Sequence, residues 1–200
     1  METEKQERII NAALKEFAQK GYEKASTNEI VKEARISKGL LFHYFKTKKD
    51  LFLFLYDFCI EILLNEFFRK IDVMEKDILI RLRQMTLLKF DLIRKHPEMF
   101  DFLMVAYGED SDDIKKELDE RNKGHIATGF KMLFAEFDAS KFREGMDIPK
   151  AIEVISWTLE GFSKKQQEKI KLVPLNKIDY ESILAEMDLY LELLKKCFYR

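Results

Sequence analysis

Residues 36–49 read ISKGLLFHYFKTKK, and this stretch decides how the rest of the chain is interpreted. Large apolar and aromatic side chains crowd its centre, lysines lie on both sides, and no acidic residue is present. A helix buried in a core would account for the apolar residues but not for the lysines, whereas a solvated loop would account for the reverse. The two faces of a single short helix therefore have to be considered separately.

A helical wheel that starts at Lys38 separates the crowded residues into two faces. Leu41, Phe42 and Phe45 fall within one sector of about 100°, which is the width of an ordinary core-facing stripe. The opposite face carries small, apolar and polar aromatic residues: Gly39, Leu40, His43 and Tyr44. A helix face that met only water would favour Glu, Lys and Gln, so this second face is predicted to meet another molecule.

The residues before this helix predict a second helix and a short turn. Ser26 followed by Glu29 has the spacing of a capping box and begins the predicted helix STNEIVKEA, whose inward side chains include Ile30. Residues 35–37 then form a turn before the helix that begins at Lys38. Two short helices joined in this way indicate a helix-turn-helix.

The rest of the chain is predicted to be helical as well, because only 3 prolines and 7 glycines interrupt it. A helix over about 4–20 precedes the helix-turn-helix, and Thr47 with Asp50 caps a long helix to about Lys70. Further helices are expected near 77–95, 98–107, 111–136, 148–170 and 177–198. We predict an all-α fold in which a small N-terminal three-helix module that contains the helix-turn-helix (1–48) joins a larger helical body (49–200).

The charge distribution supports a nucleic-acid partner although the net charge is −1. Between Arg35 and Lys49 the sequence has five basic residues and no acidic one: Arg35, Lys38, Lys46, Lys48 and Lys49. A local basic patch, and not the total charge, sets the potential that a phosphate backbone meets.

The apolar segments do not indicate a membrane protein. The chain opens with charged residues and has no apolar core of a signal peptide, and its most apolar stretch is interrupted by Asp57 and Glu61. Cys59 and Cys197 lie far apart and have no metal-ligand spacing, which is typical of thiols in a reducing compartment. We expect a cytoplasmic protein without a membrane partner.

The outward face of the third helix suits the major groove of DNA. Lys38 can reach guanine, Leu40 can contact a thymine methyl group, and Gly39 permits a close backbone approach. His43 and Tyr44 can donate to phosphates. Lys48 adds a cation, and Thr27 with the start of its helix supplies a hydroxyl and free backbone N–H groups.

Residues 9–52 resemble the DNA-binding domain of the tetracycline-repressor (TetR) family. The matching elements are AALKEFAQKGY, the frame of Thr27, Ile30 and Ala34, the segments SKG and HYFKTK, and Leu51. The resemblance implies phosphate or base contacts from these residues: Thr27, Ser37, Lys38, Gly39, Leu40, His43, Tyr44 and Lys48.

Two positions depart from the family pattern. Arg35 stands where the family usually has glycine, so we expect the turn to be held without an easy positive φ. Arg35 is therefore a further candidate for a phosphate contact. Phe42 replaces a common tyrosine and removes one hydroxyl that could reach a phosphate.

The resemblance also implies dimerisation through the last two helices. Apolar stripes on both predicted helices agree with this, although stripes of this kind also form the core within one chain. A helix-turn-helix reader normally needs two half-sites about 34–36 Å apart, which favours a twofold dimer. The candidate dimerisation residues are Ile155, Thr158, Phe162, Ile183, Met187, Tyr190 and Leu194.

A ligand cavity in the larger domain is likewise implied by the resemblance. Aromatic and Met residues there offer an adaptable apolar lining, and Tyr107 or His125 could orient a polar group of the ligand. The same side chains would equally serve as packed core. The candidates are Phe90, Met99, Phe102, Met104, Tyr107, His125, Phe130, Phe134, Trp157 and Phe162.

These features predict a repressor that binds a palindromic operator as a homodimer and is released by a small, mainly hydrophobic effector. No cofactor or metal ion is expected, because the three histidines lack ligand spacing and no nucleophile or phosphate-loop motif indicates an enzyme. The alternative is an all-helical protein-interaction module in which GLLFHYF docks into the groove of a partner protein. The dependence of binding on salt distinguishes the two.

Overall fold

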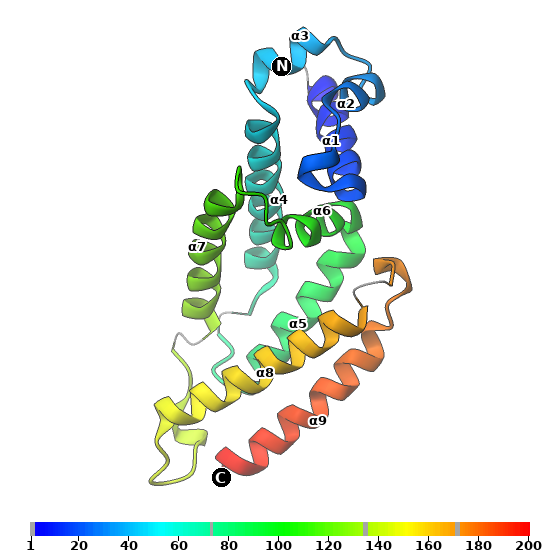
Figure 1. Cartoon of the computed structure of the whole chain (residues 1–200). Helices are drawn as coiled ribbons and strands as arrows, with labels where there is room; N and C mark the ends of the chain where they lie inside the picture. Colours follow the sequence, from blue (N-terminus) through cyan, green and yellow to red (C-terminus); the bar gives the residue numbers. More distant parts are fainter. Residues whose placement is uncertain (1–2, 73, 134–135, 171–172) are drawn as a thin grey trace. The chain divides into compact units, whose positions relative to one another are not determined.

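The computed structural model describes residues 3–72, 74–133, 136–170 and 173–200 (Figure 1). These residues form α-helices and two short 3-10 helices, and none of them lies in a strand, so the predicted all-α fold is confirmed. The α-helices are α1 (Thr3–Lys24), α2 (Thr27–Glu33), α3 (Lys38–Tyr44), α4 (Lys48–Lys70), α5 (Ile78–Lys95), α6 (Pro97–Tyr107), α7 (Lys115–Leu133), α8 (Ile148–Ile170) and α9 (Tyr180–Phe198). The 3-10 helices are η1 (Ala139–Lys141) and η2 (Leu175–Lys177).

The chain divides into two compact units. Unit 1 contains Met1–Phe68 and Lys95–Thr128, and unit 2 contains Arg69–Arg94 and Gly129–Arg200. Helices α1 to α4, α6 and most of α7 therefore belong to unit 1, and α5, α8 and α9 to unit 2. Within the described residues, no helix combines the length and the apolarity that crossing a membrane requires.

An aromatic cluster holds the helices of unit 1 together. The Phe17 ring on α1 meets Phe52 on α4 edge to face at 4.9 Å between centroids, and Phe52 lies 5.0 Å from Phe102 on α6. All three side chains are fully buried. Gly21 has a φ of 70° and a ψ of 176°, so regular helix geometry stops there, as the sequence predicts. Helix α1 is thereby fixed on α4 and α6.

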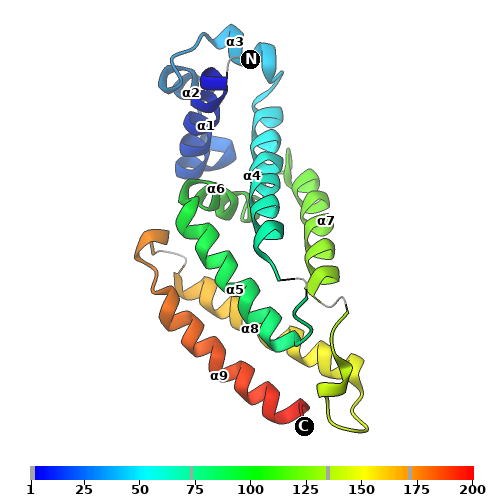
Figure 2. The ribbon, with the colours of Figure 1, turned by 180° about the vertical axis from the view of Figure 1, so that it is seen from behind.

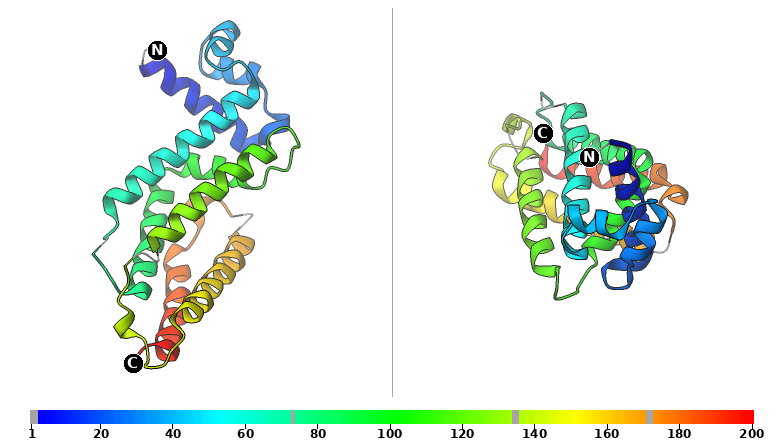
Figure 3. Two further views of the ribbon diagram at one scale, coloured as in Figure 1. Left: turned by 90° about the vertical axis from the view of Figure 1, so that its left-hand side faces the viewer. Right: turned by 90° about the horizontal axis from the view of Figure 1, so that it is seen from above.

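Helices α4 and α7 run side by side and in the same direction in unit 1 (Figures 1 and 3). Arg121 on α7 bonds to Asp57 on α4 at 3.0 Å. Nearer the start of both helices, the Lys49 ammonium lies 2.6 Å from a Glu117 carboxylate oxygen. The Tyr56 hydroxyl donates to the side-chain oxygen of Asn122. These polar contacts fix the register of the two helices.

The core of unit 2 lies between α5, α8 and α9, and α8 and α9 run side by side (Figures 1 and 2). Ile78 and Leu82 from α5 pack in one cluster with Ile155 from α8 and with Met187 and Leu191 from α9. Their helical spacing places each of them on the inward face of its helix. The apolar stripes predicted for the last two helices therefore form an intrachain core.

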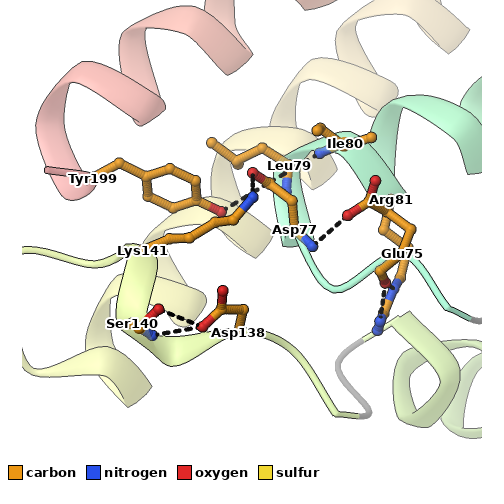
Figure 4. Close-up of polar contacts among 9 residues, drawn as sticks. All are labelled: Glu75, Asp77, Leu79, Ile80, Arg81, Asp138, Ser140, Lys141 and Tyr199. Carbon is orange, nitrogen blue, oxygen red and sulfur yellow. Dashed lines mark hydrogen bonds and ion pairs between the residues drawn. The ribbon is translucent and has the colours of Figure 1, made fainter.

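A buried carboxylate closes one end of unit 2 (Figure 4). Asp77 accepts hydrogen bonds from the backbone N–H groups of Leu79 and Ile80, from the Lys141 ammonium at 2.8 Å and from the Tyr199 hydroxyl at 3.0 Å. Burial raises the pKa of Asp77, but these bonds outweigh it and hold the pKa below its usual range. The start of α5 is thus tied to η1 and to the end of α9.

Of the two predicted capping boxes, the one at the start of α4 forms and the one at the start of α2 does not. Thr47 and Asp50 form the predicted capping box, with both side chain-to-backbone bonds at 3.0 Å. Ser26 lies at the N-cap of α2 but its side chain makes no capping bond, so the capping box predicted with Glu29 is wrong. The Ser26 backbone N–H instead donates to the Glu16 carboxylate at 2.9 Å.

Candidate nucleic-acid interface

Helices α2 and α3 form the helix-turn-helix that the sequence predicts, and three buried side chains hold it. Ile30 and Ala34 are fully buried on the inward side of α2, and Leu41 of α3 is 1% exposed. The exposed residues of α3 are Lys38, Gly39, His43 and Tyr44. Because the inward anchors are few, they fix which face of α3 is presented outward.

The turn between the helices adopts a left-handed backbone at a residue that is not glycine. Arg35 has a φ of 54°, its N–H donates to the Lys32 carbonyl, and the N–H of Ile36 donates to the Val31 carbonyl at 3.0 Å. The expectation that the turn avoids a positive φ is therefore wrong. A left-handed backbone is unfavourable for a residue that has a Cβ atom, so this turn costs conformational free energy at Arg35. The Arg35 side chain is exposed.

Helix α3 presents the two faces that its sequence predicts. Leu41 is buried and Phe42 and Phe45 are half-buried, which accounts for the inward side. On the outward side Leu40 is half-buried, and the other predicted contact residues are exposed: Lys38, Gly39, His43 and Tyr44.

The start of α3 is fixed by its own cap and leaves room for a close approach. The Ser37 hydroxyl oxygen accepts a bond from the Leu40 backbone N–H at 3.2 Å, so Ser37 acts as the N-cap of α3 and retains its own proton for donation. A Cβ atom added at Gly39 would meet no atom within 4 Å. The chain's own packing thus does not require glycine there, whereas an approaching molecule would benefit from the missing side chain.

Lys48 lies in a different environment from the other predicted contacts. Its ammonium donates to the carbonyl oxygens of Glu23 at 3.0 Å and Ala25 at 3.4 Å, and it lies 4.7 Å from the centre of the Tyr22 ring. A lysine ammonium has three protons, so one remains for a phosphate. Lys48 therefore joins the start of α4 to the end of α1, a role that the sequence does not indicate.

Two carboxylates near the basic surface around the turn, Glu33 and Asp50, are already engaged within the chain. Arg35, Lys38 and Lys46 are exposed. Glu33, at the end of α2, is paired with Lys15 at 2.8 Å, and this hydrogen bond lowers the pKa of Glu33. Asp50 is occupied by the capping box. Exposed cations beside these two engaged carboxylates suit a polyanion.

Thr27, the remaining predicted contact, is the first residue of α2 and is half-buried. Its position at the helix start leaves backbone N–H groups of the first turn without intrahelical acceptors. All nine predicted DNA contacts therefore lie on α2, the turn, α3 or the first residue of α4. The structure brings them to one module of unit 1.

The predicted ligand-binding residues are divided between the two units. In unit 1 Phe102 is buried in the aromatic cluster, while Met104 and Tyr107 are exposed. Met99 lines a hollow of about 600 Å³ between α1 and α6, together with side chains that are mostly polar. The ligand candidates of unit 1 are therefore partly core residues and partly surface residues.

In unit 2 the described ligand candidates are Phe90, Trp157 and Phe162. Phe90 packs on the Tyr180 ring at 4.9 Å, Phe162 is 9% exposed, and Trp157 is 64% exposed. These three are not gathered in one described cavity. The predictions for the side chains of His125 and Phe130, and for Phe134, lie outside the described residues.

The predicted dimerisation residues lie mainly inside unit 2. Most are in or against its core: Ile155, Phe162, Ile183, Met187, Tyr190 and Leu194. Thr158 is half-buried and its hydroxyl donates to the Val154 carbonyl at 2.8 Å. Large apolar side chains that were not predicted for the dimer are exposed on the same two helices: Val154, Leu189, Leu193 and Trp157, which was predicted for the ligand. In the sequence, these residues form a second, weaker row of apolar positions on each helix, beside the row that faces the core.

Comparison with known proteins identifies the module. Residues 9–55 match the family model described as bacterial regulatory proteins, tetR family. The helix-turn-helix of this chain is therefore of the tetR type. The match covers most of α1, all of α2 and α3, and the start of α4.

Two curated relatives match this chain in different ways, one over a short segment at high identity and one over most of the chain at low identity. The uncharacterized HTH-type transcriptional regulator YuxN of Bacillus subtilis is 54% identical over 50 residues, which cover 25% of this chain and 17% of that protein. The fatty acid metabolism regulator protein of Bacillus subtilis is 22% identical over 155 residues, which cover 76% of this chain and 78% of that protein. The first match therefore spans well under two thirds of its relative.

A solved structure shares the fold along nearly the whole chain. The transcriptional regulator FadR from Bacillus subtilis, solved in complex with stearoyl-CoA, superposes with a TM-score of 0.60 at 20% identity. The match covers 94% of this chain and 97% of that one.

Proposed function

We propose that this protein is a transcriptional regulator of the TetR family, a cytoplasmic repressor that binds a palindromic operator as a homodimer and leaves it when an acyl-chain effector binds. The observation that carries the DNA half is the division of α3 into a buried anchor at Leu41 and an exposed face with Lys38, His43 and Tyr44. The proposed DNA-binding domain is 1–48, and 49–200 is the proposed effector and dimerisation domain.

The exposed face of α3 supports insertion into the major groove. Lys38 at its start can bond to guanine, and Leu40 can contact a thymine methyl group. His43, Tyr44, Ser37 and Arg35 would then bond to phosphates on either side. Anisotropy measurements on double-stranded DNA selected from a random pool test this, since a specific site should be recovered with an inverted repeat.

The exposed apolar side chains of α8 and α9 support the homodimer. Trp157 at 64%, Leu189 at 72% and Leu193 at 58% exposure are large side chains that a monomer would leave in water. Two copies related by a twofold axis would cover them and would place two copies of α3 for two half-sites. Sedimentation of the purified chain tests this proposal.

An acyl-chain effector is supported by the relatives. A curated relative that matches most of the chain is a fatty acid metabolism regulator, and a structural neighbour was solved with stearoyl-CoA. We propose the same ligand class for this protein. Addition of oleoyl-CoA to the protein–operator complex should release the DNA, and tighter binding would contradict the release.

The rival proposal, a protein-interaction module, remains distinguishable. Apolar docking of the α3 face to a partner protein would depend little on salt. Binding to DNA should weaken linearly with log salt concentration, because each phosphate contact releases counterions.

A further inference from the structure

Helices α1 and α6 pack against each other within unit 1, and a hollow of about 600 Å³ lies between them. Three of its lining residues are apolar and withdrawn from water: Leu14 is buried, and Ala18 and Met99 are half-buried. They form an apolar floor beneath exposed polar side chains. The volume falls within the range of about 300–1,000 Å³ that small-molecule sites occupy. A small molecule with an apolar part would therefore fit this hollow.

Two carboxylates line the α6 side of the hollow. Glu98 and Asp101 are both exposed there, and they lie three residues apart, so they occupy neighbouring positions on one face of α6. Partial burial and, second to it, the negative charge of Glu98 raise the pKa of Asp101. A cation placed between the two carboxylates would remove their mutual repulsion.

The basic side chains that line the hollow are already paired elsewhere in unit 1. Lys15 on the α1 side lies 2.8 Å from a carboxylate oxygen of Glu33. His96, just before α6, lies 2.8 Å from Glu66, which also accepts a bond from Lys95 at 2.6 Å. Across the described ranges, by contrast, neither carboxylate on the α6 side forms a hydrogen bond or an ion pair. The hollow therefore presents negative charge that the chain does not neutralise.

Helix electrostatics account for one of these carboxylates but not for the other. Glu98 lies in the first turn of α6, where the partial positive charge of the helix start favours an acidic residue. Asp101 lies beyond the first turn and gains little from this effect. A carboxylate that its neighbour repels and that lacks a bonding partner among the described residues would gain most from a cationic ligand.

The other wall and the floor indicate which kind of cation fits. Asn11 and Gln19 on α1 line the hollow and are exposed, and each side-chain amide has an oxygen that can accept a further N–H. A hydrated metal ion would leave the apolar floor uncovered, whereas the methylene groups of an organic cation would cover it. Charge and apolar area together favour an ammonium group on an alkyl chain.

We propose that the hollow between α1 and α6 binds an alkylammonium ion, with its ammonium between Glu98 and Asp101 and its chain on the apolar floor. Such a ligand contacts both helices and would stabilise unit 1 against unfolding. The site takes a cation, so it goes beyond the proposed acyl-chain effector and does not depend on it.

The test measures the binding of hexylammonium chloride, hexan-1-ol and magnesium chloride to the full-length protein by calorimetry at pH 7, where an alkylamine is protonated as a lysine side chain is. Asp101→Asn and Glu98→Gln each remove one charge and keep the size of the side chain. The matched controls are Asp91→Asn and Glu61→Gln, at exposed carboxylates of α5 and α4 outside the hollow. Thermal melting without ligand shows whether each variant folds, and Asp101→Asn should melt at or above the parent temperature because it loses a like-charge repulsion.

The expected result is that hexylammonium binds the parent and both controls alike and loses affinity by about tenfold or more in at least one of Asp101→Asn and Glu98→Gln, as for a lost bond to a charged group. Hexan-1-ol should bind the parent more weakly than hexylammonium and should not distinguish the variants. A parent that does not bind hexylammonium, or a smaller loss in both hollow variants, would overturn the inference. Magnesium binding that these variants abolish, with hexylammonium unaffected, would assign a metal ion to the hollow and would also overturn it.

Discussion

The ammonium of Lys48 lies 4.7 Å from the centre of the Tyr22 ring and donates to two backbone carbonyls at the end of α1. One side chain thus connects the first helix of the DNA-binding module to the helix that leaves it. A residue predicted only as a phosphate contact therefore also holds the module together.

Lys48→Met should lower both stability and DNA affinity. The cation–π contact and two hydrogen bonds disappear, so the free energy of unfolding should fall by about 1 kcal/mol. Lys46→Met is the control, because Lys46 is exposed and should change DNA affinity alone. Urea denaturation and anisotropy on the same samples separate the two effects, and an unchanged stability in Lys48→Met would contradict the connecting role.

Arg35→Gly and Arg35→Ala should differ in stability but not in DNA affinity. Both remove the charge, but only glycine adopts a φ of 54° without a steric penalty. The glycine variant should be more stable than the alanine variant by about 1 kcal/mol, in line with the cost of left-handed backbone. Equal stabilities in urea denaturation would argue against a strained turn, and an affinity equal to the parent would exclude a phosphate contact.

Lys38→Ala and Leu40→Ala should change which DNA sequence is preferred. Each lost base contact should reduce discrimination at one position of the half-site by about 1–3 kcal/mol. Lys46→Met should instead weaken binding to all sequences alike and reduce the salt slope by about 1. The measurement is anisotropy on a panel of single-base operator variants. A uniform loss for Lys38→Ala would reassign Lys38 to the phosphate backbone.

Trp157→Glu or Leu193→Glu should convert the dimer to monomers of 23.9 kDa. Both side chains are exposed on α8 and α9, so a charge there is tolerated by the monomer but not inside an apolar interface. Ile80→Glu is the control, since Ile80 is 44% exposed on α5 of the same unit. Sedimentation equilibrium reads the mass. A parent that sediments as a monomer would contradict the dimer proposal.

Asp77→Asn should lower stability in a manner that depends on pH. The folded-state pKa of Asp77 is lowered, so its stabilising contribution is present above the unfolded value of about 3.9 and is lost as the pH falls through the folded value. At pH 7 the variant should be less stable by about 2 kcal/mol, as expected for bonds to a buried charge. The difference in the free energy of unfolding between the variant and the parent should become smaller below about pH 4. Urea denaturation from pH 3 to pH 7 measures it, and a constant difference over this range would contradict the prediction.

The faces of α3 could be predicted from the sequence because a short helix with one buried residue, Leu41, leaves little choice of orientation. The missing capping bond of the Ser26 side chain could not be predicted, because the Ser26 backbone N–H donates to Glu16 of the preceding helix, a contact between separate helices. Arg35 shows a similar limit, since composition favours glycine at positive φ but does not forbid another residue there.

The effector and dimer residues were harder to predict because one pattern serves two purposes. A stripe such as Ile155 and Phe162 marks the apolar side of a helix, and in this protein that side packs into the core of unit 2. The weaker second edge, with Trp157, was assigned to the ligand, and it is the exposed one. Periodicity identifies an apolar side but not the partner that covers it.

The central claim is that the exposed face of α3 reads a palindromic DNA site. The most direct measurement is the affinity of the purified chain for its selected operator across salt concentrations, beside a scrambled duplex of the same composition. The account predicts that two chains bind one operator, that the logarithm of the association constant falls linearly with the logarithm of salt concentration, and that the scrambled duplex binds more weakly by about 10³-fold or more. Equal affinity for both duplexes, or operator binding that salt does not weaken, would contradict it.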